Sequence, residues 1–428
     1  MREKKPIKKW MKLDNAAKIY PAARSVGWMS VFRLSAILTE KIDPEILKEA
    51  ERRTALRFPS MCQKLKKGLF WYYLEEITES PVPEKDVKNP CASFDFRERN
   101  GYMFRVRYHE NRIALEVFHV LTDGTGGLVF LKTLIAEYLE LKYGVKIPRD
   151  DSILDVNEKP KKEEIEDSHV RYARGKTLKR DMEKAYRQKG EREEKGYTNV
   201  VTAIMDTENL RNTAKKYGAT VTEYLTAALV LSFHEIQTRE KKAKEKVLPV
   251  RICVPVNLRK FYNSKTMRNF AQFVNVGVDY SLGEASFEEI LKQVKCEMGL
   301  LASERMLNAK FSANVRDEKN KFMRLVPLFI KNPVMKTIFK LNGDRTSSTT
   351  LSNLGLVTLP DEMSKYITRF DFMLGALSRN PSAFASISYN GVTTVNMVRS
   401  IKNSEAEKNF CRFLVKDGVH VKVESNSL

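Results

Sequence analysis

The sequence predicts an α/β protein with mixed sheets, built as two lobes. Its 428 residues exceed what a single hydrophobic core usually serves. Segments with strand-like composition alternate along the whole chain with segments of helical periodicity. The order strand, tight turn, strand, corner and helix occurs twice, at residues 105–141 and at residues 386–415. This echo indicates two related αβ lobes, although sequence identity between the segments is negligible and coincidence is the alternative.

Local patterns predict the elements of the first half. In order, they are strand 29–38, helix 44–57, strand 68–75, loop 81–90, strands 102–108 and 113–118, and helix 128–141. Asp43 is expected to cap the first helix, with Pro44 in its first turn. The two strands from 102 to 118 are close enough in sequence to form a hairpin, whose second strand leads directly to His119.

The second half is predicted in the same way. Its elements are strand 200–205, helix 221–237, strands 250–256 and 273–280, helix 287–307, a broken helix at 323–339, strands 348–351, 370–374, 383–389 and 393–398, and helix 406–415. Thr220 or Thr222 is expected to cap the helix at 221, with Glu223 in its first turn. Pro327 and Pro333 predict the break near residue 330.

A charged segment separates the two halves. Residues 159–195 are polar and rich in both signs of charge, which indicates either a solvated helix or a linker, and linkers are the commoner outcome. We therefore expect a first lobe at residues 1–180, a charged linker at 181–198 and a second lobe at 199–428. The linker should lie outside any active site and tolerate substitution.

Composition restricts the partners of the protein. The net charge of +21 raises the possibility of nucleic-acid binding. However, acidic residues alternate with the lysines and no aromatic-basic platform is evident, so we expect a lysine-rich surface and no nucleic acid. No apolar run is long enough to span a bilayer, and the basic N-terminus lacks the apolar region of a secretory signal. Five scattered cysteines form no zinc pattern, which favours a cytoplasmic protein without a metal.

The most informative motif is His-Val-Leu-Thr-Asp-Gly at residues 119–124. It follows a predicted strand and precedes a predicted helix. Histidine is the usual general base at neutral pH, and Asp123 can turn back to brace the loop. Alternatively, His119 is a core histidine bonded to backbone, and Asp123-Gly124 only makes a turn. A phosphate-binding loop is disfavoured, because the glycines match neither G-x-x-x-x-G-K-[ST] nor G-x-G-x-x-G.

The motif H-x-x-x-D-G resembles the signature of the chloramphenicol acetyltransferase-like superfamily. Condensation domains of that group usually carry a second histidine, where this chain has Phe118. Other segments agree with the superfamily in order and spacing. They are Val-Pro-Val-Asn-Leu-Arg at 254–259, Asn-Phe-Ala-Gln-Phe-Val-Asn-Val at 269–276, Leu-Ser-Asn-Leu-Gly at 351–355 and Asp-Phe-Met-Leu-Gly at 371–375. The opening of the chain, at 12–17 and 57–59, looks most like bacterial alcohol acetyltransferases.

Two of these segments depart from the superfamily pattern. No glycine precedes Asn269, and Met373 and Leu374 replace the glycine and tryptophan of the D-F-G-W-G block of plant-type members. The resemblance nevertheless extends over nearly the whole chain. It implies two chloramphenicol acetyltransferase-like lobes with an active-site tunnel between them. It also implies transfer of an acyl group from acyl-CoA, as a co-substrate rather than a bound cofactor, to an alcohol or amine.

The resemblance assigns roles to individual residues. His119 would be the general base, and Asp123 with Gly124 would support its loop, with Asp123 paired to Arg259. The alternative for Arg259 is a surface charge after a strand.

Acyl transfer also needs donors for an oxyanion. Ser352, Asn353 and Thr350, or Thr349 with Thr350, are the polar candidates, and their alternative is strand-end turn chemistry. The partners would be a small acyl donor and an acceptor. A carrier protein as donor, or a non-catalytic binding protein of the same fold, stays open.

Overall fold

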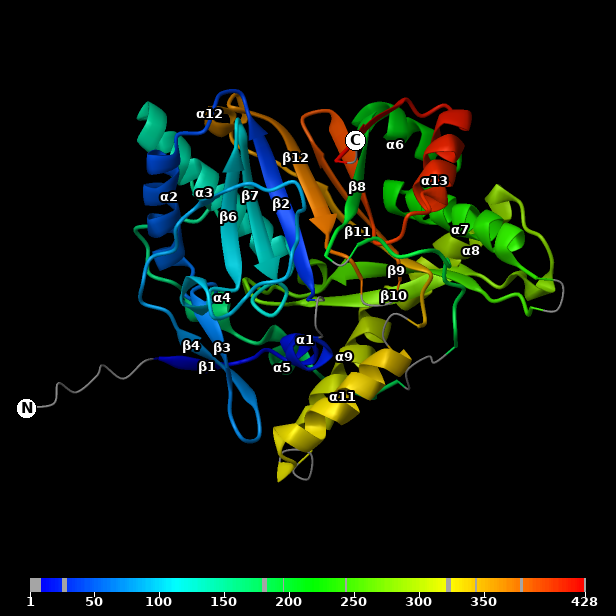
Figure 1. Ribbon diagram of the computed structural model, residues 1–428, viewed down its shortest axis with the longest axis horizontal. Helices are drawn as coiled ribbons and strands as arrows, with labels where there is room; N and C mark the ends of the chain where they lie inside the picture. The colour runs from blue at the N-terminus through cyan, green and yellow to red at the C-terminus, as the bar shows by residue number, and fades with distance from the viewer. Residues whose placement is uncertain are drawn as a thin grey trace, which may run out of the picture.

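Two large β-sheets and the helices that cover them form the framework of the protein (Figure 1). The computed structural model describes residues 9–24, 29–178, 183–194, 196–242, 245–320, 325–342, 345–377 and 380–426. Within these residues, one sheet has five strands, a second has seven and a small third sheet has three. The expected α/β class with mixed sheets is confirmed.

The five-stranded sheet belongs to the first lobe. Its strands, in spatial order, are β12 (Ile367–Leu374), β2 (Val31–Leu38), β7 (Arg112–Phe118), β6 (Phe104–His109) and β5 (Glu84–Lys85). Helices α2 (Pro44–Arg57) and α3 (Gly124–Tyr143) pack on each other, and α3 packs on β2 and β7 (Figure 1). Asp43 caps α2 as expected, since its carboxylate accepts from the amides of Glu45 and Ile46.

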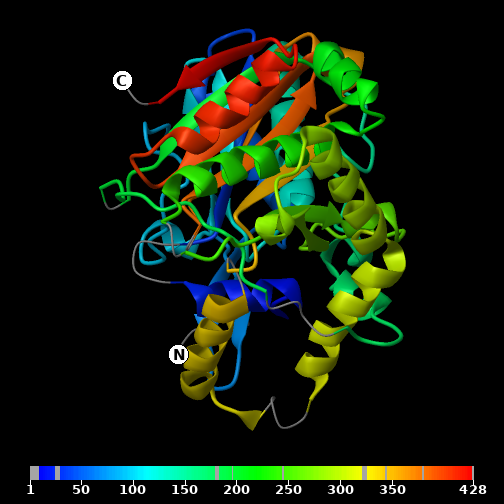
Figure 2. The same ribbon diagram turned by 90° about the vertical axis from the view of Figure 1, so that its right-hand side faces the viewer.

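The seven-stranded sheet belongs to the second lobe. Its order is β10 (Ala271–Val278), β9 (Val250–Asn257), β11 (Thr349–Leu356), β13 (Ser382–Tyr389), β14 (Val392–Arg399), β8 (Asn199–Asp206) and β15 (Val421–Ser425). Only the pairs that β11 makes with β9 and β13 are parallel. Helices α6 (Thr207–Lys216), α7 (Val221–Glu240), α8 (Phe287–Leu301) and α13 (Glu405–Lys416) accompany this sheet (Figure 2).

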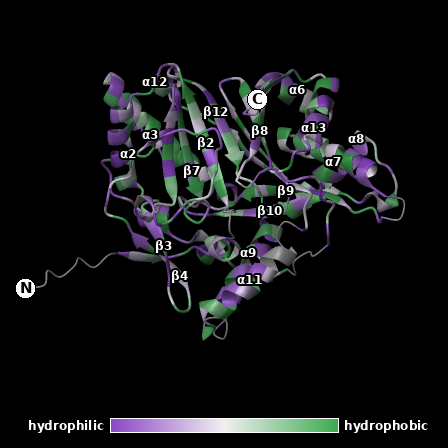
Figure 3. Ribbon diagram, viewed as in Figure 1, coloured by the Kyte–Doolittle hydropathy of each residue, from purple (hydrophilic) through white to green (hydrophobic). Residues whose placement is uncertain are grey.

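The two sheets are joined by β12. This strand comes from the second half of the chain, between β11 and β13, yet it pairs with β2 at the edge of the first sheet. It also packs on β13 and β14 of the second sheet. Buried apolar side chains form two large clusters, one around β2, β7 and α3 and one around α7, β9 and β10, as two lobes require. Figure 3 colours the ribbon of these elements by the hydropathy of each residue. The lobes are therefore not separated by a single point along the chain, and the boundaries predicted at 181 and 198 stay predictions.

Most of the remaining elements lie below the two sheets in Figure 1, whereas α12 (Asp361–Ser364) lies at the top. The third sheet consists of β1 (Trp10–Lys12), β4 (Tyr72–Glu76) and β3 (Gln63–Lys67). The accompanying helices are η1 (Ala16–Lys18), α1 (Ile19–Ala23), α4 (Lys162–Ile165), α5 (Ser168–Tyr172), α9 (Glu304–Lys319) and α11 (Leu328–Asn342). The described residues also form three short 3-10 helices and one short α-helix: η2 (Arg99–Gly101), η3 (Leu258–Lys260), η4 (Tyr280–Leu282) and α12 (Asp361–Ser364).

Some expected elements differ from the structure. The strand predicted at 68–75 is instead the turn and most of the second strand of the β3–β4 hairpin, with Gly68 and Trp71 closing the turn. The helix predicted at 287–307 is two helices, because the chain breaks at Ala302 and Ser303. Helix α6 and strand β15 were not predicted. The expected helix at 323–339 falls partly outside the described residues, and α11 continues through Pro333.

The charged segment is more ordered than a solvated linker. Glu164 of α4 is buried and forms an ion pair of 2.6 Å with Arg57. His169 of α5 is buried between Phe270 and Phe311. Further on, Tyr186 is also buried against the second lobe. The expectation that the segment tolerates change is therefore wrong for these residues, because their side chains are buried in contacts with other segments. The sequence did not reveal this, since a few buried side chains cannot be recognised among so many charged ones.

The predicted echo between the lobes is present. Strands β6 and β7 with α3 follow the same order as strands β13 and β14 with α13. In the first copy the corner carries His119. In the second copy Arg399 ends β14 and forms an ion pair with Glu407 of α13, so that corner carries no base in the corresponding place.

Candidate active site

His119 lies at the corner between β7 and α3. Its backbone amide donates to the carbonyl of Ser30 at 2.9 Å, which extends the pairing of β2 and β7 by one step. The imidazole is half-buried. Tyr20 of α1 stacks on it at 4.8 Å between ring centroids, and the ring of Phe32 meets it edge-on at 5.3 Å. Burial in these surroundings lowers the pKa of His119 below its ordinary value, so the ring is neutral at pH 7.

The amide of Asn269 determines which ring nitrogen of His119 carries the proton. Nδ1 of His119 lies 2.9 Å from Oδ1 of Asn269. The amide Nδ2 of Asn269 donates to the carboxylate of Asp14 at 3.2 Å and to the backbone carbonyl of His119 at 3.1 Å. Because both of these partners can only accept, the amide oxygen must face the ring and Nδ1 must be the donor. In the neutral imidazole Nε2 then has a free lone pair.

Asp14 anchors this arrangement from the N-terminal segment. Its side chain is completely buried. One carboxylate oxygen accepts from the amide of Ala17 at 2.7 Å, and the other lies 3.6 Å from the guanidinium of Arg268. Arg268 in turn donates to the carbonyl of Lys12 at 2.7 Å. The N-terminal segment therefore reaches His119 in two ways. Asp14 holds Asn269, which binds the imidazole, and Tyr20 stacks on the imidazole directly.

Asp123 caps helix α3 and pairs with Arg259. Its Oδ1 accepts from the amide of Gly126 at 3.0 Å, and its Oδ2 accepts from Arg259 at 2.8 Å and from the amide of Phe270 at 2.8 Å. Burial alone would raise the pKa of Asp123, but the charge and hydrogen bond of Arg259, with the two amides, hold this pKa below its ordinary value. The expected ion pair is thus present.

Arg259 is fixed by backbone carbonyls as well as by Asp123. Its guanidinium donates to the carbonyl of Thr266 through Nε and Nη2 and to the carbonyl of Arg268 through Nη2 at 2.7 Å. Asn257, at the end of β9, accepts from the Arg259 amide and donates to the hydroxyl of Thr125 in α3 at 3.1 Å. These bonds join the His119 corner of the first lobe to the end of β9 in the second.

Two glycines allow this close approach. A Cβ atom on Gly126 would lie 2.2 Å from the hydroxyl of Thr122 and 2.3 Å from the carbonyl of Met267, and both distances are prohibitive. Thr122 itself donates to that carbonyl at 2.5 Å. A Cβ atom on Gly124 would lie 2.9 Å from a methyl carbon of Leu354. The first turn of α3 therefore fits against two segments of the second lobe only because Gly124 and Gly126 carry no side chain.

Strand β11 presents two of the polar candidates toward the first lobe. Leu351 of this strand belongs to the hydrophobic cluster of the second lobe, and side chains alternate along a strand, so Ser352 and Thr350 share the opposite face. Ser352 is also in register with Ala385, whose side chain belongs to the hydrophobic cluster of the first lobe. Ser352 is buried and Thr350 is half-buried.

Asn353 lies on the opposite face of β11. Its Nδ2 donates to the hydroxyl of Thr222 at the start of α7, at 3.0 Å. Its Oδ1 accepts from the amide of Gly355 at 2.8 Å, which is strand-end turn chemistry. The role predicted for Asn353 at an oxyanion stays a prediction, and its contacts favour Ser352 and Thr350 over it.

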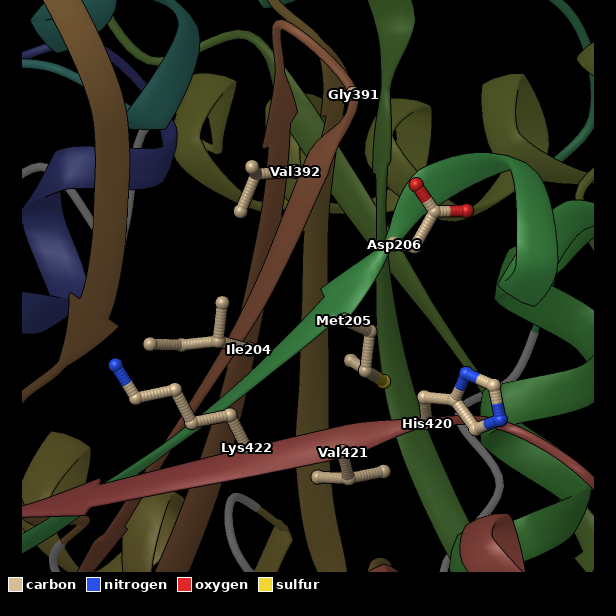
Figure 4. Close-up of a pocket in the computed structure, with 8 residues that line it drawn as sticks. All are labelled: Ile204, Met205, Asp206, Gly391, Val392, His420, Val421 and Lys422. Carbon is tan, nitrogen blue, oxygen red and sulfur yellow. The ribbon is translucent and has the colours of Figure 1, made fainter.

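A surface hollow elsewhere in the second lobe is unrelated to His119. It lies between β8 and β15, at the far edge of the sheet from β9, β10 and β11 (Figure 4). Its lining includes Asp206, His420 and Lys422, whose side chains diverge (Figure 4). Over the described part of the chain, no His, Cys, Asp and Glu side chains gather as a metal site would need. Nor does any described helix have the length and apolarity to cross a membrane.

The comparison with protein families assigns the chain. Residues 167–416, more than half of the sequence, match the profile of the alcohol acetyltransferase family. The chain belongs to the alcohol acetyltransferase family. This membership makes it a member of a group of acyltransferases, as the motif implied. A comparison with the sequences of curated proteins finds no significant match.

Solved structures share the fold of this alcohol acetyltransferase family member. Polyketide synthase associated protein 5 of Mycobacterium tuberculosis is 14% identical, with a TM-score of 0.60 over 94% of this chain and 96% of that chain. Trichothecene 15-O-acetyltransferase of Fusarium sporotrichioides is 11% identical, with a TM-score of 0.59 over 96% and 94%. The starter condensation domain of rhizomide synthetase, solved with C8-CoA and Leu-SNAC, is 10% identical, with a TM-score of 0.59 over 95% and 93%.

Several residues of the site were not singled out from the sequence. Asn269 and Asp14 fall in segments that resemble the superfamily, but their contact with each other and with His119 joins positions 255 and 150 residues apart. Tyr20 and Phe32 look like ordinary core aromatics in the sequence. The sequence offered one signal for such residues, namely single polar residues within otherwise apolar segments. A residue of this kind is expected to be buried and hydrogen-bonded, but the sequence does not identify its partner.

Proposed function

We propose that this protein transfers an acyl group from an acyl-CoA thioester to an alcohol or amine, with His119 as general base. The hydrogen bond between Nδ1 of His119 and Asn269 carries this proposal. A histidine that only packs in the core also needs its ring N–H bonded, but it does not need its other nitrogen left able to accept a proton. Here the amide fixes the proton on Nδ1 and leaves Nε2 able to accept another, while burial keeps the ring neutral.

The proposed reaction proceeds in two steps. The acceptor hydroxyl gives its proton to Nε2 of His119 as its oxygen bonds to the thioester carbonyl carbon, which forms a tetrahedral intermediate with an oxyanion. The intermediate then collapses, the carbon–sulfur bond breaks, and the leaving thiolate takes the proton back from Nε2. The imidazolium that exists between the steps is stabilised by the Asn269 and Asp14 chain of hydrogen bonds.

Two substrates must approach the base from different sides. We infer a channel between the lobes, because the His119 corner is bounded by β2 and α1 of the first lobe and by the segment before β10 of the second. The hydroxyls of Ser352 and Thr350 on β11 would bind the oxyanion or the substrate. Asp123, Gly124 and Arg259 would keep the corner in shape. No cofactor beyond the acyl-CoA co-substrate enters this scheme.

A carrier-protein thioester is the alternative donor. The neighbouring condensation domains share this fold, and the pantetheine arm of such a donor would need the same opening as that of coenzyme A. Release of free thiol should be measured with a panel of acyl-CoAs and mixed alcohol and amine acceptors. Turnover with any acyl-CoA supports the proposal. Acyl transfer only from a carrier-bound thioester would replace the donor, and no transfer from either donor would indicate a non-catalytic binding protein.

A further inference from the structure

One end of the molecule carries a cluster of exposed apolar side chains. The turn of the β3–β4 hairpin lies along the first turn of α11, since the amide of Leu328 donates to the carbonyl of Leu69 at 2.8 Å. The ammonium group of Lys331 also lies 4.1 Å from the ring centre of Trp71. In Figures 1 and 2 the hairpin and α11 extend together away from the two large sheets. We call the exposed apolar residues here the apolar tip; they are Leu69, Trp71, Leu325, Phe329, Ile330 and Val334.

The apolar tip is costly for a protein in water. Its six side chains are between 45% and 72% exposed. On α11, Ile330 and Val334 are one turn apart and Phe329 is adjacent, so these residues form a stripe along the helix. A contiguous exposed patch of aromatic and long aliphatic residues marks an interaction surface, whereas single exposed apolar residues are ordinary.

The charge around the apolar tip is of one sign. Residues 63–74 contain three lysines and no acidic residue, and the sequence of α11 also contains three lysines and no acidic residue. Lys67 is exposed beside the hairpin turn, and Lys66 and Lys336 are partly exposed. The acidic residues of the hairpin, Glu75 and Glu76, lie at its end away from the turn, where Glu75 forms an ion pair with Lys64. The turn of the hairpin and α11 therefore carry lysines without carboxylates.

We propose that the apolar tip binds the surface of an anionic lipid bilayer. A tryptophan with aliphatic neighbours suits the boundary between headgroups and acyl chains, and lysines beside them can keep their charge at the anionic headgroups. The tip protrudes, as a membrane-inserting surface must (Figure 1). The described helices include none able to cross the bilayer, so the association would be peripheral.

The position of the apolar tip gives this binding a use. Helix α11 packs against α1, whose Tyr20 stacks on His119. A bilayer bound at the apolar tip would therefore lie on the same side of the molecule as α1, which forms one wall of the candidate active site. Apolar acceptors or acyl chains dissolved in the membrane would be concentrated there. The binding itself does not depend on the proposed chemistry, and the His119→Ala variant should bind vesicles like the native protein.

Sedimentation with vesicles tests the proposal. The full chain should sediment with vesicles of phosphatidylcholine and phosphatidylserine, and much less with phosphatidylcholine alone. Single substitutions Leu69→Ser, Phe329→Ser and Ile330→Ser should each weaken binding severalfold, and the triple variant at least about tenfold. Leu282→Ser is the matched control, because Leu282 is 91% exposed but lies on η4 of the second lobe. Thermal unfolding of each variant separates loss of binding from loss of fold.

Tryptophan fluorescence supplies a second measurement on folded protein. Brominated lipids in the anionic vesicles should quench the emission of Trp71, so Trp71→Phe should remove most of the quenching and Trp10→Phe should leave most of it. Absence of sedimentation, equal sedimentation of the triple variant, or quenching that persists in Trp71→Phe would each overturn the proposal. Self-association in the absence of vesicles that is abolished by the triple substitution would overturn it in favour of a second copy of this chain.

Discussion

The imidazole of His119 and the amide of Asn269 share a hydrogen bond of 2.9 Å across 150 residues of sequence. The orientation of that amide is fixed by two further partners, which can only accept hydrogen bonds. The tautomer of the histidine is thus set by a residue of the second half of the chain and held by Asp14 from its opening segment. The following predictions test this arrangement and the corner on which it depends.

Replacing His119 by alanine should abolish most of the catalysis without unfolding the protein. Loss of a general base typically lowers the rate by about 10²–10⁴-fold. The assay is acyl transfer by thiol release, accompanied by a thermal unfolding curve. His109→Ala is the matched control, since His109 is exposed at the end of β6. Turnover of His119→Ala at the native rate would remove the histidine from the mechanism.

Replacing Asn269 by aspartate should shift the pH dependence of the reaction. In the native protein burial lowers the pKa of His119, so activity should persist down to a pH below about 6.5 before the ring is protonated. Because the new side chain would face the Asp14 carboxylate, Asn269→Asp is combined with Asp14→Asn. A carboxylate beside Nδ1 would then stabilise the imidazolium and raise that pKa, so the acidic limb of kcat/KM should move to higher pH. The exposed Asn157→Asp should leave the profile unchanged. An unshifted acidic limb in the double variant would mean that the amide does not control the base.

Replacing Asp123 by asparagine should reduce both stability and activity. Removing one partner of a buried ion pair leaves Arg259 without its counter-charge and typically costs about 3–5 kcal/mol. The pKa of Asp123 is depressed in the folded protein, so its contribution is complete above about pH 4 and is lost as pH falls further. The difference in unfolding free energy between the native protein and the variant should therefore narrow in acid. Asp361→Asn, at an exposed position, should cost little at any pH.

Replacing Gly126 by alanine should distort the His119 corner. The new methyl group would meet the Met267 carbonyl at 2.3 Å, and that backbone cannot move without disturbing the neighbouring Arg268 and Asn269. We expect a loss of stability and a fall in kcat. Gly299→Ala is the control, since a Cβ atom there meets nothing within 4 Å inside α8, and it should stabilise by up to about 1 kcal/mol. Equal behaviour of the two variants would argue against close packing at the corner.

Much of the fold follows from local sequence, and the rest does not. Asp43, Thr220 with Glu223, and the hairpin at Asn390-Gly391 all act within four residues, so the corresponding elements could be predicted with nearly correct bounds. The break between α8 and α9 at Ala302 and Ser303 lacks glycine or proline, and the sequence there gives no stop signal. Strand β15 is mostly exposed, so its composition lacks the apolar character that marks a strand.

The candidate site also contains residues that the sequence could predict and residues that it could not. His119, Asp123 and Gly124 are adjacent in sequence, so their motif could be recognised, and the contact of Asp123 with Arg259 followed from the resemblance. The face on which Ser352 and Asn353 lie depends on the register of β11 with β13, which a sequence does not reveal. The roles of Asn269 and Asp14 required three distant segments to be placed together.

The place of β12 has a consequence for how this chain is made. During synthesis β2 and β7 are complete long before residues 367–374 emerge. One edge of β2 therefore stays without its partner strand until more than half of the protein has been made. An open edge of this kind invites pairing with other chains. A truncated first half would be expected to aggregate rather than fold. The full-length protein should show a slow refolding phase, because the pairing of β2 with β12 closes a long loop of the chain. Cutting the gene at the charged segment would leave the first product without β12, and the second product with a β12 that has lost its partner β2.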